Sequence, residues 1–214
     1  MFDGFLGGFY RFGEVVMMLL YVNILWVIFT VLGLGFFGFG PSTVAMYTVF
    51  RRWSMGEIDV PVFTTFWDAY RKHFLKANLL GILILLIAYM LYVNLNFFEL
   101  QNEWFSIIVR YTILIATFFF GIMLIYIFPL YVHYDNTFFN HFKNSILIAI
   151  FHPIRTAYAV AALFTLYYLF SVLPVLIFLM GPSLVSMVIM WISYRTFARV
   201  EYRNELLQDE ETEE

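Results

Sequence analysis

Long apolar runs separated by short polar stretches constrain this chain more than any other feature of its sequence. Several runs, such as 77–97 and 105–131, reach or exceed the roughly 20 residues that a helix needs to cross a hydrocarbon core about 30 Å thick. A transmembrane β-barrel would instead show alternating segments of about ten residues. Hydrophobic residues make up 63% of the chain and charged residues only 13%, far from the balance of a soluble domain. The sequence therefore predicts an all-α, polytopic helical membrane bundle.

A heptapeptide that occurs twice bears on how the chain turns. Gly40-Pro41-Ser42-Thr43-Val44-Ala45-Met46 returns as Gly181-Pro182-Ser183-Leu184-Val185-Ser186-Met187. Each copy follows a long apolar run and leads into a shorter one that ends in arginine. Because proline is favoured in the first turn of a helix, we expect two hairpins, Glu14 to Trp53 and Thr156 to Val200, that turn at Gly-Pro.

These signals predict a single transmembrane domain, 1–204, with six membrane segments. The segments cover about 14–39, 41–53, 77–97, 105–131, 156–180 and 182–200, and the second is short. Proline at 174 is expected to kink the fifth segment. Residues 140–151 are expected to form a short surface helix that ends at His152-Pro153, because the residue before proline avoids the helical region. The acidic stretch 205–214 is expected to be a disordered tail.

Lysine and arginine positions predict the orientation. With both termini in the cytoplasm, every lysine and arginine except Arg110 lies on the inner side, as the positive-inside rule requires. The alternative fuses the first two segments, which leaves five spans and places the N-terminus and Arg11 outside. The charge rule barely separates the two arrangements. The repeat favours six segments, because the second and sixth share their opening sequence and their basic end.

The second segment is short for a membrane crossing. Residues 41–51 rise only about 15 Å as a helix, roughly half the hydrocarbon thickness. We therefore expect the Gly-Pro turn to lie within the membrane. Glycine-broken helices are typical of transporter sites, whereas close helix packing also uses small residues. Packing is the simpler interpretation.

Residues 61–76 have the pattern of an amphipathic helix at the inner membrane interface. Asp59 and Pro61 are suitable start signals. A membrane-surface anchor is the simpler interpretation, and a docking helix for a partner is the alternative. Apolar side chains recur at helical spacing and charged ones occupy other faces: Val62, Phe63, Phe66, Trp67, Tyr70 and Phe74 against Asp68, Arg71, Lys72 and Lys76.

Several motifs in the first 80 residues are distinctive. They are Asn23–Trp26, Phe37–Ala45, Arg51–Trp53, Gly56–Asp59 and Phe66–Trp67. Together they resemble the YesL family of small bacterial membrane proteins, although the family often has alanine where Ser42 stands here. The resemblance implies a role beside carbohydrate ABC importers and glycoside hydrolases, and it supplies no catalytic residues. The candidate motif residues are Gly40, Pro41, Ser42, Thr43, Arg51, Arg52, Trp53, Gly56, Glu57, Asp59 and Trp67, with Gly181, Pro182 and Ser183 as the repeat.

Few side chains offer catalytic or metal chemistry. His133 and Asp135 lie near the end of the fourth segment, with His141 and His152 further on, but without a metal-binding spacing. The chain has no cysteine. We therefore predict no enzyme activity, no cofactor and no metal. Glu14 is expected to form an interfacial salt bridge with Arg11, Arg51 or Arg52, and the asparagines at 23, 78, 94 and 96 are expected to add polarity to packing.

Three functions stay open. The first is an accessory or interaction component of carbohydrate or polysaccharide ABC-type uptake, with the lipid bilayer and importer permease subunits as partners. The alternatives are a small autonomous transporter or channel, for which a homodimer is one arrangement, and a membrane enzyme acting on envelope glycans or lipids. In each case we expect a multi-pass protein of the bacterial plasma membrane with no nucleic-acid partner.

Overall fold

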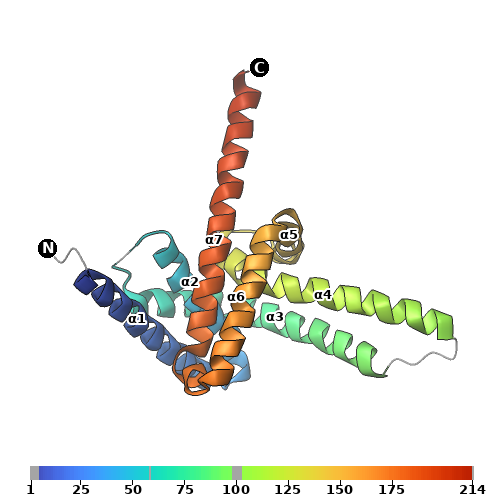
Figure 1. Ribbon diagram of the computed structural model, residues 1–214, viewed down its shortest axis with the longest axis horizontal. Helices are drawn as coiled ribbons and strands as arrows, with labels where there is room; N and C mark the ends of the chain where they lie inside the picture. Colours follow the sequence, from blue (N-terminus) through green and yellow to red (C-terminus); the bar gives the residue numbers. More distant parts are fainter. Residues whose placement is uncertain (1–4, 58, 98–102, 214) are drawn as a thin grey trace.

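The computed structural model describes residues 5–57, 59–97 and 103–213, with side chains over 7–57, 59–96 and 104–201. Within these ranges the chain forms seven helices and no strand, which confirms the all-α class (Figure 1). Five helices contain a stretch long and apolar enough to cross a membrane. They are α1 (Phe5–Leu32), α3 (Val62–Phe97), α4 (Glu103–His133), α6 (Pro153–Val172) and α7 (Val175–Glu213).

The centre of the bundle is α2 (Phe36–Ser54), which packs against α1, α3, α4 and α7. Its residues from Gly40 to Tyr47 are all buried. By length and composition α2 is not among the five candidate spans, so the six predicted spans are not confirmed. Its 19 residues nevertheless rise about 28 Å, so the expected half-length second segment is wrong.

The first hairpin turns at Gly33-Leu34-Gly35 and not at Gly40-Pro41. Leu34 and Gly35 have φ values of 59° and 74°, in the left-handed region that glycine enters without strain. A Cβ added to Gly33 would lie 2.3 Å from the Cα of Gly38, so only glycine allows this approach. Gly40-Pro41 lies inside α2, which continues through it. Because the chain reverses here, residues 14–53 do not form the single span of the five-span alternative.

The second hairpin turns at Leu173-Pro174, before the second copy of the repeat. Pro174 separates α6 from α7 instead of kinking one segment, because proline removes a backbone donor from a helix interior but suits the first turn of the next helix. Gly181-Pro182 lies inside α7. Both predicted hairpins therefore exist, and in both the turn precedes Gly-Pro.

The two heptapeptides meet in the core. Ala45 and Met46 belong to the same hydrophobic cluster as Leu184 and Met187. The first copy lies on α2 and the second on α7, and these two helices pack directly against each other. The repeat thus marks the packing surface between α2 and α7, and not a pair of turns.

The amphipathic stretch 61–76 is not a separate interfacial helix. It forms the first turns of α3, which continues without a break to Phe97. Its apolar face packs on the body, because the rings of Phe66 and Tyr70 lie 5.3 and 5.0 Å from that of Phe29. The Tyr70 hydroxyl also donates a hydrogen bond to the Phe29 carbonyl. No proline interrupts this segment, so nothing in the sequence separates an interfacial part from a membrane part.

The outer halves of α3 and α4 leave the body as a two-helix arm (Figure 1). We call residues 82–96 of α3 and 104–119 of α4 the α3–α4 arm. None of these residues is buried. With 36 residues, α3 is about 54 Å long, more than a straight crossing requires.

The connection from α4 to α6 contains α5 (Phe138–Phe151), and His152 ends it before Pro153. The predicted short helix is therefore confirmed. At the C-terminus α7 continues to Glu213, where we expected a disordered tail, and it projects from the body (Figure 1). Glutamate, leucine and glutamine are good helix formers, and extending an existing helix avoids the cost of nucleation.

Candidate functional site

The motif from Gly40 to Trp67 divides into a buried half and a polar half. The buried half is the Gly-Pro-Ser-Thr segment of α2. A Cβ added to Gly40 would lie 2.7 Å from the Ala77 carbonyl oxygen, so glycine lets α2 approach the backbone of α3. The Thr43 hydroxyl donates to the Phe39 carbonyl at 2.7 Å and accepts from Trp26 Nε1 at 3.1 Å. These contacts support the packing interpretation of the glycine-rich hairpin.

Other buried polar groups extend this packing role. Asn23 Nδ2 of α1 donates to the Phe178 carbonyl of α7 at 2.9 Å. Ser183 is buried and donates to the Met180 carbonyl at 3.1 Å. Ser42 is also fully buried, and its hydroxyl has no hydrogen-bond partner among the described residues.

The polar half begins at the end of α2, where Arg51 joins three helices. Arg51 Nε donates to His133 Nδ1 of α4 at 3.2 Å, and His133 Nε2 lies 3.2 Å from the Glu201 carboxylate of α7. Because arginine only donates, Nδ1 is the accepting nitrogen. His133 therefore carries its proton on Nε2 and donates it to Glu201. The ring stacks against Phe197, with centroids 4.9 Å apart.

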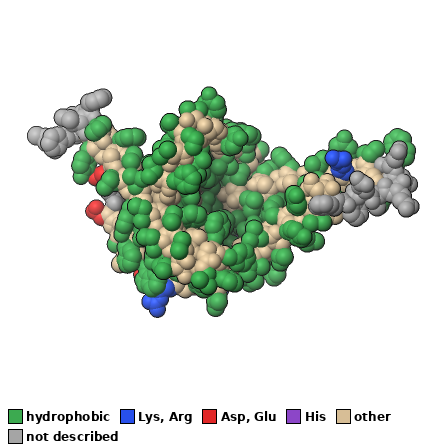
Figure 2. Space-filling view, turned by 90° about the horizontal axis from the view of Figure 1, so that it is seen from below, with side chains coloured by type: hydrophobic (Ala, Val, Ile, Leu, Met, Phe, Trp, Pro, Cys, Tyr) green, Lys and Arg blue, Asp and Glu red, His purple; other side chains and the backbone are tan. Residues whose placement is uncertain are grey.

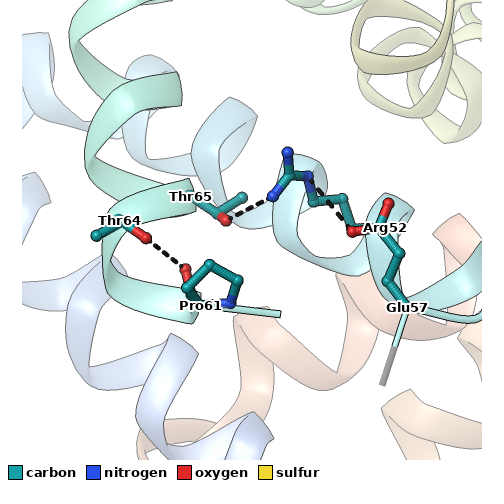
Figure 3. A network of polar contacts seen from close by, with 5 residues as sticks. All are labelled: Arg52, Glu57, Pro61, Thr64 and Thr65. Carbon is teal, nitrogen blue, oxygen red and sulfur yellow. Dashed lines mark hydrogen bonds and ion pairs between the residues drawn. The ribbon is translucent and has the colours of Figure 1, made fainter. Parts of the chain in front are cut away.

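The neighbouring Arg52 holds the loop between α2 and α3 (Figure 3). Its Nη1 donates to the Thr65 hydroxyl at 3.2 Å, and its Nε lies 3.8 Å from the Glu57 carboxylate. Gly56 has φ of 92°, a conformation that allows the loop to reverse toward α3. At the start of α3, Thr64 donates to the Pro61 carbonyl at 3.0 Å. Gly56 and Glu57 of the motif thus shape the loop between α2 and α3 and tie it to Arg52.

The remaining motif residues lie around this end of the bundle. Trp53 and Asp59 line one cavity with Arg11 and Glu14. Glu14 forms no ion pair within 4 Å among the described side chains, and Arg51 and Arg52 are engaged elsewhere. The predicted Glu14 salt bridge is therefore wrong. Trp67 stacks on Tyr70, and the Arg71 guanidinium lies 5.4 Å from its ring centroid.

Sequence reasoning missed a second histidine network at the end of α4. His73 Nδ1 and the Tyr131 hydroxyl are hydrogen-bonded at 3.2 Å, and Tyr131 also packs against His141 of α5. Burial lowers the pKa of His141 below its usual value. His73 lies on the amphipathic stretch, three residues from Tyr70. This position is the only feature of the sequence that could have indicated a role for His73 in the network. Asp135 is exposed, and the described residues contain no cluster of three histidine or acidic side chains that would hold a metal ion.

An apolar cavity of about 540 Å³ lies where the α3–α4 arm leaves the body. Figure 2 shows the molecule from below, with hydrophobic side chains spread over much of this face and a hollow where the arm meets the body. Gly40, Phe36 and Phe39 line the cavity from α2, with Asn78 and Gly81 from α3. The first hairpin therefore borders a cavity, with Gly35 of its turn also in the lining.

Comparisons with known proteins identify the relatives of this chain. A family model described as "Protein of unknown function, DUF624" matches residues 19–95, which contain both halves of the motif. The chain is 38% identical over 199 residues to YteU of Bacillus subtilis, covering 93% of this chain and 89% of that protein. It is 37% identical to YesV over 188 residues (88% and 90%) and 30% identical to YesL over 199 residues (92% and 93%), both from the same organism. No solved structure matches this chain.

The relatives cover nearly the whole chain, so the similarity extends well beyond the N-terminal motifs. All three are described only as uncharacterized proteins. The chain thus belongs to the YesL-like DUF624 family.

Proposed function

We propose that this protein is a non-enzymatic accessory component of ABC-type carbohydrate or polysaccharide uptake in the plasma membrane. It contacts a permease subunit of the importer through the α3–α4 arm. The arm is the observation on which the proposal depends, and the family resemblance supplies the link to sugar import.

The arm differs from the rest of the bundle in what it packs against. The body surrounds α2 with four helices, whereas no residue at 82–96 or 104–119 is buried. Ile108, Ile115 and Phe118 have exposed fractions of 63%, 57% and 64%. Helix association in lipid depends on side-chain packing and not on a hydrophobic driving force. A two-helix arm that leaves the body is therefore well suited to pack between the helices of another membrane protein.

Photo-crosslinking in the native membrane tests this proposal. A photoreactive residue at Ile108 or Ile115 should capture a permease subunit, identified by mass spectrometry. The same residue at Phe164 on α6, which is 70% exposed, is the matched control and should capture far less. Equal capture from both faces, or capture only of a second copy of this chain, would contradict the assignment of the arm. Unchanged polysaccharide uptake in a deletion strain would refute the accessory function itself.

The cavity at the base of the arm favours a second candidate, an autonomous transporter or channel. Gly81 lines this cavity, and a Cβ added there meets no atom within 4 Å. Gly81→Leu therefore places a side chain in the cavity, and its Cβ meets no close contact. Gly121→Leu is the matched control, because Gly121 also has open space but does not line the cavity. Solute flux in proteoliposomes that Gly81→Leu abolishes and Gly121→Leu preserves would favour transport over the accessory function.

A further inference from the structure

A second cavity, of about 700 Å³, lies between the start of α6 and the later turns of α7. Three arginines line it: Arg155 from α6, and Arg195 and Arg199 from α7. None of them belongs to the motif, and none takes part in the arm. The cavity also contains Trp191 and Tyr158, aromatic side chains that are common at the membrane–water boundary.

The three guanidinium groups converge although they have like charge. Arg195 and Arg199 are four residues apart on α7, so they lie on one face, where like charges repel. Arg155 reaches across from α6 and donates a hydrogen bond from Nη1 to the Arg195 carbonyl. The Arg195 guanidinium lies 3.7 Å from the centroid of the Trp191 ring. The packing of α6 against α7 therefore adds the positive charge of Arg155 to the two that already lie on one face of α7.

Nothing in the described protein neutralises this charge. Among the side chains at 7–57, 59–96 and 104–201, no carboxylate lies within 4 Å of these arginines. Glu201, two residues beyond Arg199, is directed to His133. In addition, the N-terminus of α6 lines the cavity through Pro153 and Ile154 and has no side-chain cap. A helix N-terminus adds positive partial charge and favours an anion.

Apart from His152 and the Tyr158 hydroxyl, the rest of the cavity wall is mainly apolar. Ile154, Ala162, Val188 and Ile192 continue from the arginines along the two helices. The cavity thus joins a cationic end, with the bidentate geometry that arginine offers to phosphate, to a hydrophobic groove. This combination matches the phosphate and the upper acyl chain of a lipid, whereas a free anion would use only the cationic end.

We propose that the α6–α7 cavity binds the phosphate group of an anionic phospholipid, with the acyl chain along the apolar wall. The three arginines hold the phosphate, and Trp191 fixes the Arg195 guanidinium. The bound lipid supplies the negative charge that the described protein does not. It thereby ties α6 to α7 at the membrane boundary.

The test uses the full-length purified protein in phosphatidylcholine nanodiscs with an increasing fraction of phosphatidylglycerol. Thermal unfolding and native mass spectrometry report lipid binding. Phosphatidylglycerol should raise the Tm of the wild type and of Arg110→Gln, a control on the arm. The apparent lipid affinity should fall about fivefold for Arg199→Gln and further for the double variant with Arg195→Gln, because each basic residue near the surface contributes on the order of 1 kcal/mol.

Two further measurements distinguish lipid from free phosphate and control for misfolding of the variants. Inorganic phosphate should not raise the Tm at concentrations that match the lipid. Protection by inorganic phosphate equal to that by lipid would overturn the lipid assignment, as would equal binding of phosphatidylcholine. The variants with lysine at 195 and 199 keep the charge and should retain part of the effect. Unchanged lipid affinity in Arg199→Gln would refute the lipid site. That result would not bear on the proposed function of the arm, because the cavity and the arm share no residue.

Discussion

Alanine at Gly40 and alanine at Gly181 make the same change at the same position of the heptapeptide, in two different surroundings. The added Cβ at Gly40 would lie 2.7 Å from the Ala77 carbonyl oxygen, which is backbone of α3 and cannot rotate away. At Gly181 the nearest atom is Ile177 Cγ2 at 3.5 Å, an ordinary contact. The pair therefore isolates the close approach of α2 and α3.

The magnitude follows from two opposing effects. Alanine is favoured over glycine inside a helix by about 1 kcal/mol, and this gain is common to both sites. Forcing an extra carbon into a packed contact costs about 1–3 kcal/mol, and this loss applies only at Gly40. We expect Gly181→Ala to raise the free energy of unfolding by about 1 kcal/mol. The two variants should then differ by about 1–3 kcal/mol, with Gly40→Ala the less stable.

Thermal unfolding in a mild detergent measures the difference. For a chain of this size, 1 kcal/mol corresponds to about 2–4 °C in Tm. Gly38→Ala extends the series, because its Cβ would lie 2.3 Å from the Thr30 carbonyl oxygen, and it should unfold below Gly181→Ala as well. Equal Tm values for Gly40→Ala and Gly181→Ala would refute the reasoning, since they would show that the helices separate freely.

Three further predictions follow from the polar network and the turns. Arg51→Gln and His133→Gln should each lower stability by about 1–2 kcal/mol and be less than additive together; additive losses in a double-mutant cycle would contradict the network. Burial lowers the pKa of His141 in the folded state, so as pH falls the unfolded state protonates this histidine before the folded state does. The Tm should therefore drop below about pH 6.5, and His141→Gln should flatten this pH dependence. The chain has no cysteine, so single cysteines at Leu34 and Met55, both exposed, should be labelled from opposite sides of the membrane if α2 crosses, and from one side if it does not.

The sequence alone determined the class of this protein and much of its order. Apolar runs of membrane length leave few options besides helices, because lipid offers no hydrogen bonds to the backbone. The break at His152-Pro153 was also predictable, since proline restricts the residue before it. Both hairpins were visible in the repeat, because each copy follows a long apolar run.

The positions of the turns depended on tertiary contacts. Gly-Pro is a plausible helix start in each hairpin, yet the chain turns earlier. In the first hairpin, glycines at 33 and 38 allow two helix backbones to meet. The network of Arg51, His133 and Glu201 was equally invisible, because it joins residues on three helices whose partners only packing selects. No local pattern indicated that α3 and α4 would leave the body as an arm.

The position of α2 illustrates this division best. By hydropathy α2 was the weakest candidate for a membrane segment, with its glycines, its hydroxyl residues and two arginines. The tertiary structure places α2 at the centre of the bundle, surrounded by four helices that are apolar enough to face lipid. The physical reason is that Thr43 and Arg51 find their hydrogen-bond partners on neighbouring helices and not in hydrocarbon. The apolar runs determined which helices can face lipid, and tertiary packing decided that these helices enclose α2.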